Sequence, residues 1–146
     1  MSEPTAAPVP CARAFLHAIV WGEHTAVWDL LSEAGRTTVL SVAVGQGLDR
    51  VVARRMRDGL ADPADRDDFL RRLLEGLRRD LRSVELGKLT VDPVATPAEA
   101  GRVVVEMQVP SEIPGTGPWP AGRIVLGRDT AGGWGVDRLE PRLVTP

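Results

Sequence analysis

The sequence predicts an α+β domain in which N-terminal helices pack on one face of an antiparallel sheet of about four strands. Apolar residues recur at helical spacing as far as Val84, whereas after Gly87 they alternate with polar residues, as they do along strands. The strand patterns follow one another without helices between them, which excludes a parallel sheet built from βαβ units.

The length of the chain fits one domain. A chain of 146 residues can bury a full hydrophobic core without disulfides or a structural metal. Residues 1–10 contain three prolines and several small residues, so we predict a flexible tail there. Residues 11–146 show no internal repeat and no linker, and we expect them to fold as a single domain.

The first half of the chain shows a series of helical patterns separated by glycines. We predict a first helix from Cys11 to Trp21, which Gly22 ends, and a second from Glu23 to Ser32, which Gly35 ends. Residues 36–47 contain β-branched residues and fit either a strand or a helix, but the spacing of their apolar residues favours a helix.

A further helix is predicted between Gly47 and Gly59, and the longest one follows it. The longest helix begins at Asp62, a suitable N-cap residue, with Pro63 at its first position, and ends at or just before Gly87. Its apolar stripe consists of Leu70, Leu73, Leu74, Leu77, Leu81 and Val84. Acidic residues precede its arginines at i, i+4 spacing, so we interpret the arginines as a salt-bridged surface rather than a nucleic-acid contact.

The second half of the chain shows strand patterns. The first strand pattern covers Lys88 to Val94, and Pro93 is expected to end this strand. The other predicted strands are Arg102 to Pro110, Arg123 to Asp129 and Trp134 to Glu140. Alternation in the second strand puts Val103, Val105, Met107 and Val109 on one face and Arg102, Val104, Glu106 and Gln108 on the other. Thr96 to Glu99 matches a capping box and predicts one helical turn.

The segment from Pro110 to Gly122 is long for a hairpin turn and is rich in proline and glycine. We predict an ordered flap that sets Trp119 against the helices or against a partner chain. A turn is expected at Asp129 to Gly133, and a short tail from Pro141.

The segment ARAFLHAIVWGEHTAVWDLLSEAGR, residues 12–36, resembles the nuclear-transport-factor-two-like and SnoaL-like superfamily. The matching positions are Phe15, Leu16 and Ala18 in the first helix, then Gly22 and Glu23, and Leu30, Leu31 and Ser32 at the end of the second helix. The order of the elements matches over most of the chain, although the helical stretch of residues 36–84 departs from the commoner pattern. The resemblance implies a cone-shaped, cystatin-like fold with a curved sheet. The superfamily includes enzymes, binding modules and assembly domains, so the fold alone does not decide the function.

Composition and charge restrict the function. A formal net charge of −2 gives no overall attraction to nucleic acid or to an anionic membrane, so neither is expected as a partner. Cys11 is the only cysteine, which excludes an intrachain disulfide and a cysteine-based zinc site, and no motif indicates another metal or a cofactor. The start of the chain lacks a secretory pattern and no long apolar run is present, so a cytoplasmic location is expected.

Three residues are candidates for catalysis: His17, Asp29 and Glu106. His17 could act as a general base in a cavity, or it could share the solvent-exposed face of the first helix with Arg13. Asp29 forms an i, i+4 pair with Glu33, which could serve acid–base chemistry if one carboxylate is desolvated and is otherwise an exposed pair. Glu106 is either a polar anchor in a cavity or a charge on the sheet surface.

Three tryptophans are candidates for ligand binding: Trp21, Trp28 and Trp119. An indole ring provides a large apolar area and one hydrogen-bond donor, which suits pockets and interfaces. Trp21 and Trp28 could instead fill the core, whereas Trp119 belongs to the loop discussed above.

Two functions follow as hypotheses. The first is a binding or assembly module with an apolar pocket between helices and sheet for a small apolar ligand. It would be a homodimer through the sheet face, because faces such as that of Val103 and Met107 are too apolar to remain in water. The alternative is a cofactor-independent cyclase, isomerase or hydrolase acting on an apolar small molecule through His17, Asp29 or Glu106.

Overall fold

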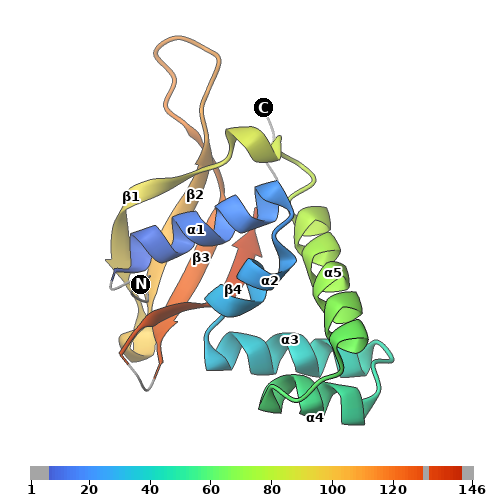
Figure 1. Cartoon of the computed structure of the whole chain (residues 1–146). Coiled ribbons are helices and arrows are strands. Elements are labelled where there is room, and N and C mark those ends of the chain that lie inside the picture. The colour runs from blue at the N-terminus through green and yellow to red at the C-terminus, as the bar shows by residue number, and fades with distance from the viewer. Residues whose placement is uncertain (1–6, 130–131, 143–146) are drawn as a thin grey trace.

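The computed structural model describes residues 7–129 and 132–142. Over these residues it confirms the α+β class, with helices followed by a four-stranded antiparallel sheet (Figure 1). The elements are α1 (Pro8–Trp21), α2 (His24–Leu30), α3 (Glu33–Gly45), α4 (Arg50–Asp58), α5 (Pro63–Asp80), η1 (Leu86–Lys88), β1 (Thr90–Pro97), η2 (Glu99–Gly101), β2 (Val103–Val109), β3 (Trp119–Arg128) and β4 (Trp134–Pro141). Most of the predicted N-terminal tail, the middle of the turn after Asp129 and the last four residues lie outside the described residues.

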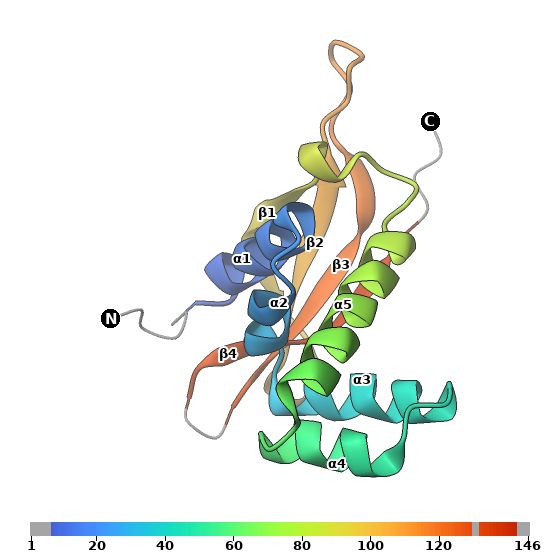
Figure 2. The same cartoon turned by 45° about the vertical axis from the view of Figure 1, so that its right-hand side comes forward.

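The sheet has the strand order β1-β2-β3-β4, and each neighbouring pair is antiparallel, as the sequence predicts. Helix α1 lies across one face of the sheet, α5 runs beside it, and α3 and α4 form a helical pair at one end of the molecule (Figure 2). The described residues therefore form a curved sheet with helices on one face.

The core lies between α1 and the sheet. The side chains of Val105 and Met107 on β2 are 0% exposed and face the same core as Phe15 and Ile19 of α1. This assignment of faces was predicted from the alternation in β2. Helices of the same chain cover this apolar face, so the expectation that it is exposed and drives dimerisation is wrong.

Helix α1 begins at Pro8, so residues 8–10 are helical and not part of a flexible tail. Proline fits the first turn of a helix because the amide hydrogen that it lacks would have no partner there. The predicted end is confirmed: Gly22 adopts the left-handed conformation, with φ of 73°, and its amide donates to the carbonyl of Ala18.

The boundary between α2 and α3 differs from the prediction. Gly35 does not end a helix; it lies in the first turn of α3, and the break falls at Leu31 and Ser32. The Ser32 hydroxyl caps α3 by accepting a hydrogen bond from the amide of Gly35 at 3.0 Å. The helical interpretation of residues 36–47 is confirmed, since α3 runs to Gly45.

Helix α5 starts at Pro63 as predicted but ends at Asp80, earlier than predicted. A turn follows Asp80, and it directs Leu81, which is 1% exposed, into the core. The stripe is also rotated slightly from the prediction. Phe69, Leu70 and Leu74 are buried, whereas Leu73 and Leu77 are only partly buried.

The charged face of α5 contains the predicted pairs of Asp67 with Arg71 and of Asp68 with Arg72. His24 of α2 adds a second contact to Asp67, at 2.8 Å from its carboxylate. The hydrogen bond from Arg71, and after it the one from His24, holds the pKa of Asp67 below its ordinary value.

Arg78 is exposed, as the sequence predicts for these arginines, but its partners are backbone carbonyls and not a carboxylate. Its guanidinium donates to the carbonyl oxygens of Ile19 and Val20, both at 2.9 Å, at the C-terminal end of α1. Carbonyls at a helix end lack partners within the helix, so Arg78 satisfies two of them and joins α5 to α1.

Strand β1 continues past Pro93, where the sequence predicts an end, to Pro97. Proline is tolerated because β1 is an edge strand and its pairing with β2 shifts register between Val91 and Ala95. The predicted helical turn also moves, since it comprises Glu99–Gly101 rather than Thr96 to Glu99.

The connection between β2 and β3 projects beyond the sheet and away from the helices (Figures 1 and 2). Trp119 is already part of β3, where it pairs with Val109 and is half-buried. Ile113 in the loop is 60% exposed. The loop itself thus points away from the helices, and Trp119 lies at its base, in the first position of β3.

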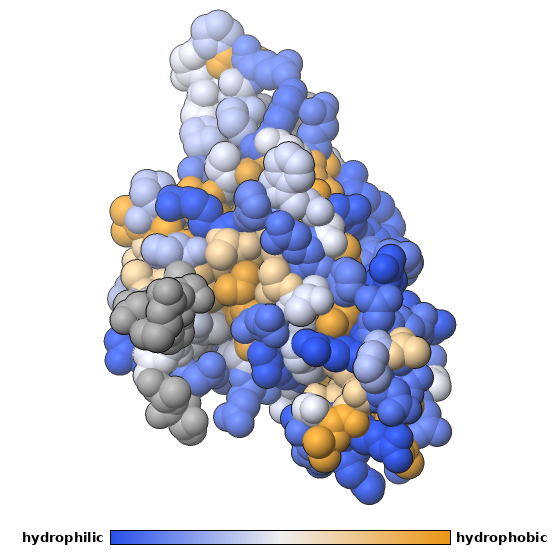
Figure 3. Space-filling view, in the orientation of Figure 1, coloured by the Kyte–Doolittle hydropathy of each residue, from blue (hydrophilic) through white to orange (hydrophobic). Residues whose placement is uncertain are grey.

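The face shown in Figure 3 is largely hydrophilic, with apolar atoms exposed in its middle and over the end of the molecule that contains α4. Three apolar side chains in or next to the helical pair are at least half exposed, namely Val42, Val51 and Leu60. Among the described residues, none of the helices combines the length and the hydropathy needed to cross a membrane.

Candidate functional site

The three candidate catalytic residues lie on separate elements. His17 lies on α1, Asp29 on α2 and Glu106 on β2, and all three are exposed. Glu106 occupies the sheet face opposite the core, while the ring of His17 lies 5.9 Å from that of Trp21, tilted by 41°, on the outside of α1. The structure does not bring these side chains together.

The three candidate tryptophans occupy different environments. Trp28 is 5% exposed and packs edge-on against Phe69, with the Arg36 guanidinium 5.1 Å above its ring. Trp21 is 70% exposed at the end of α1, and Trp119 begins β3. Of the two alternatives that the sequence allows for Trp28, ligand binding or core filling, the structure shows the core position.

A groove of about 770 Å³ lies between α3 and α5. Its apolar lining consists of Val39, Val42 and Ala43 of α3, Leu48 from the α3–α4 connection, and Phe69, Leu73, Gly76 and Leu77 of α5. The half-buried state of Leu73 and Leu77 follows from this groove, because their outer sides face it rather than another layer of protein. The cavity lies between helices, whereas the sequence predicts one between helices and sheet.

Charged residues surround the apolar lining of the groove. They comprise Asp49, Asp68, Glu75 and Asp80 against Arg72 and Arg79, four carboxylates and two guanidinium groups, for a formal charge of −2. Asp68 is paired with Arg72 at 3.1 Å, and Asp49 accepts the amides of Val51 and Val52 at the start of α4. The rim therefore favours neutral or cationic molecules over anions.

The chemistry available in the groove is that of binding. Its described lining includes no histidine, cysteine or serine, and its one hydroxyl, that of Thr38, donates to the Ala34 carbonyl of its own helix at 3.0 Å. A nucleophile next to a general base would be needed for covalent catalysis. The lining supplies apolar area and peripheral charge instead.

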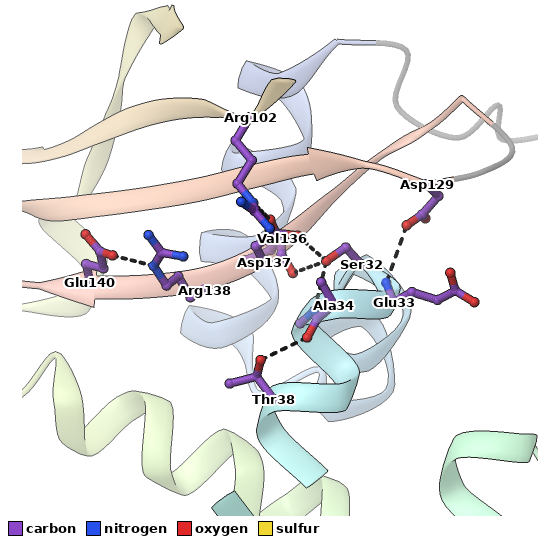
Figure 4. Close-up of polar contacts among 11 residues, drawn as sticks. Ser32, Glu33, Ala34, Thr38, Arg102, Asp129, Val136, Asp137, Arg138 and Glu140 are labelled. Carbon is purple, nitrogen blue, oxygen red and sulfur yellow. Dashed lines mark hydrogen bonds and ion pairs between the residues drawn. The ribbon is translucent and has the colours of Figure 1, made fainter. Parts of the chain in front are cut away.

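A buried polar cluster joins α3 to the sheet (Figure 4). Asp137 of β4, 9% exposed, accepts hydrogen bonds from the Ser32 hydroxyl and from Nε of Arg102, the latter at 2.6 Å. The backbone amide of Ser32 donates to the Val136 carbonyl at 2.9 Å, and a parallel bridge pairs Leu31 with Val136. A buried carboxylate needs such partners, so the cluster fixes the start of α3 on the edge of β4.

Two glycines permit this close approach. A Cβ on Gly35 would lie 2.3 Å from the Val136 carbonyl oxygen, and a Cβ on Gly135 would lie 2.8 Å from the backbone of Ser32. Sequence reasoning missed the cluster. The only local signal for it is Ser32 followed by an acidic first turn, which is typical of a helix N-cap.

Comparison with known proteins gives no match to a protein family, to a curated protein or to a solved structure, so the resemblance to the SnoaL-like superfamily stays a prediction.

Proposed function

We propose that this chain is a binding module whose α3–α5 groove holds a small molecule with an apolar body. The observation that carries this proposal is the combination of partly exposed apolar side chains on both helices with a volume of about 770 Å³. Binding sites for small molecules are mostly apolar clefts of roughly 300–1,000 Å³ with a few polar groups.

The rim defines the ligand class further. With a formal charge of −2 around the apolar lining, a neutral molecule or one with a positive end fits better than an anion. The alternative function, a cofactor-independent enzyme, needs two titratable groups in an apolar cavity, and none of His17, Asp29 and Glu106 lines this groove. Homodimerisation stays a prediction, but the apolar face of β2 no longer supports it.

Gly76 allows a direct test of the groove. A Cβ at this position would meet nothing within 4 Å, so a larger side chain can occupy the groove without a clash with backbone. We expect the neutral dye N-phenyl-1-naphthylamine to bind the wild-type chain with a rise in fluorescence, and Gly76→Leu to abolish most of that rise. Replacement of a helical glycine also favours folding by roughly 0.5–1 kcal/mol, so the melting temperature should not fall.

Gly45→Leu is the matched control, because Gly45 ends α3, has open space around it and does not line the groove. It should leave dye binding unchanged. An anionic analogue, anilinonaphthalene sulfonate, should bind more weakly than the neutral dye. Equal fluorescence from wild type and Gly76→Leu would mean that the dye binds elsewhere and would reject the groove as the site.

A further inference from the structure

A second hollow, of about 350 Å³, opens on the sheet face opposite α1. Its lining comes from the β1–β2 connection and from three strands: Ala98, Glu99, Arg102, Val104, Arg123, Val125 and Arg138. Three arginines surround two valines, and we call this hollow the arginine basin. None of its residues lines the α3–α5 groove.

The floor of the basin is apolar and continuous across the sheet. Val104, Val125 and Arg138 are direct cross-strand neighbours on β2, β3 and β4. Val125 is only 2% exposed although its neighbours Ile124 and Leu126 point to the opposite, helix-covered face. The aliphatic parts of arginine side chains commonly cover apolar surface in this way while their charged ends stay at the surface.

Carboxylates hold the three arginines at their Nε atoms. Arg102 donates from Nε to Asp137 at 2.6 Å, Arg123 donates from Nε to Glu140 at 2.5 Å, and Arg138 donates from Nε to the other oxygen of Glu140. Within the described part of the chain, no further hydrogen bond engages these three guanidinium groups. The terminal amino groups of each are thus available to another acceptor.

Strand geometry brings the charges to this face. The register between β3 and β4 shifts so that Val125 pairs with Arg138 and Leu126 with Val136, which leaves Asp137 as the extra residue of a bulge. Gly127 provides room for the Asp137 carboxylate, which would lie 2.9 Å from a Cβ at that position. The bulge lets Asp137 hold Arg102 while the next residue, Arg138, lines the same basin.

The charge balance of the lining is positive. Among the lining residues, three guanidinium groups stand against the single carboxylate of Glu99, a formal charge of +2. The carboxylates of Asp137, Glu140 and Glu106, which neighbour these arginines from outside the lining, bring the sum to −1, so an anion would depend on the exposed donors and not on net charge. Asp137 is buried beneath Arg102, and Glu140 is shared by two arginines, which hold its pKa below the ordinary value, Arg138 more than Arg123. The guanidinium side chains remain 40–53% exposed, so a solute can reach them.

We propose that the arginine basin binds a compact oxyanion, a phosphate or a carboxylate group, with the terminal amino groups of Arg102, Arg123 and Arg138 as donors. Guanidinium groups match both anions because their donors are planar and form paired hydrogen bonds. An apolar substituent on the anion would rest on Val104 and Val125. The site is separate from the groove of the proposed function and does not depend on it.

The proposal is tested by ¹H–¹⁵N NMR titration of the full chain with inorganic phosphate, and separately with malonate, at constant ionic strength. We expect saturable shifts of the backbone amides of Val104, Val125 and Arg138 with at least one of the two anions. Response to phosphate alone or to malonate alone identifies the anion class, and response to both supports a general oxyanion site. Absence of saturable shifts with both anions overturns the proposal.

Variants separate binding in the basin from nonspecific ionic effects. Arg138→Gln should lower the affinity for the anion about tenfold, the loss expected for one charge-assisted hydrogen bond. Arg123→Gln provides a second variant if Arg138→Gln unfolds. Arg71→Gln, at an exposed position of α5 that lines neither hollow, should change nothing. Glu140→Gln removes a competing charge and should strengthen binding about threefold. Unchanged affinity in both basin arginine variants would show that the arginines only link the strands. Weaker binding in Glu140→Gln would contradict the expected competition between Glu140 and the anion.

Discussion

Replacement of Gly35 with alanine is expected to destabilise the protein by about 3 kcal/mol or more, at the upper end of overpacking effects. The added Cβ would lie 2.3 Å from the carbonyl oxygen of Val136 and 3.1 Å from that of Asp137. Both are backbone atoms, and the first already accepts the amide of Ser32. The start of α3 would have to move away from β4, which would also disturb the bond between Ser32 and Asp137.

Gly45→Ala is the control in the same helix. No atom lies within 4 Å of its future Cβ, so the substitution should change the free energy of unfolding by less than about 1 kcal/mol, in the stabilising direction. Urea unfolding followed by circular dichroism measures both variants. If Gly35→Ala is as stable as Gly45→Ala, the contact between α3 and the β4 backbone is not as close as described.

Truncation of Leu70 to alanine should cost about 2–5 kcal/mol, because this side chain is 2% exposed within the core. Leu73→Ala should lower the free energy of unfolding by less than about half of that amount. Leu73 lies one turn further along α5 but faces the open groove, so its truncation removes less buried area and leaves no closed cavity.

Arg72→Ala, between these two positions, tests the exposed face of α5. Its pair with Asp68 is 77% and 64% exposed, and such pairs contribute roughly 0–1 kcal/mol. The expected order of destabilisation in chemical unfolding is Leu70, then Leu73, then Arg72. If Leu73→Ala destabilised the protein as much as Leu70→Ala, this would contradict the description of the groove as open.

Local patterns predict most of the helices and strands. The N-terminal start of α5 at Pro63, the end of α1 at Gly22 and the alternation in β2 each depend on residues that are neighbours in sequence. Gly35 illustrates the limit. A glycine after a helical stretch is typical of a helix end, but here it permits contact with a strand about a hundred residues later, which no local pattern reveals.

The candidate site is less predictable for the same reason. Leu73 and Leu77 fit the apolar stripe of α5 as well as Leu70 does, and only the position of α3 decides that they line a groove. Asp137 follows a strand pattern, but its burial depends on a bulge and on Arg102 from another strand. His17 and Asp29 are candidates by residue type and by their positions on predicted helices, and both are exposed in the structure.

The docking of Leu31 and Ser32 on Val136 also limits how two copies of this chain can exchange strands. An open sheet can accept a foreign strand at either of its outer edges, and at the β4 edge the Val136 carbonyl is already engaged within the chain. At the opposite edge, β1 contains Pro93 and Pro97, which have no amide hydrogen to offer an incoming strand. Both borders therefore hinder domain swapping and fibril growth, which leaves the helical surfaces and the faces of the sheet as routes to association.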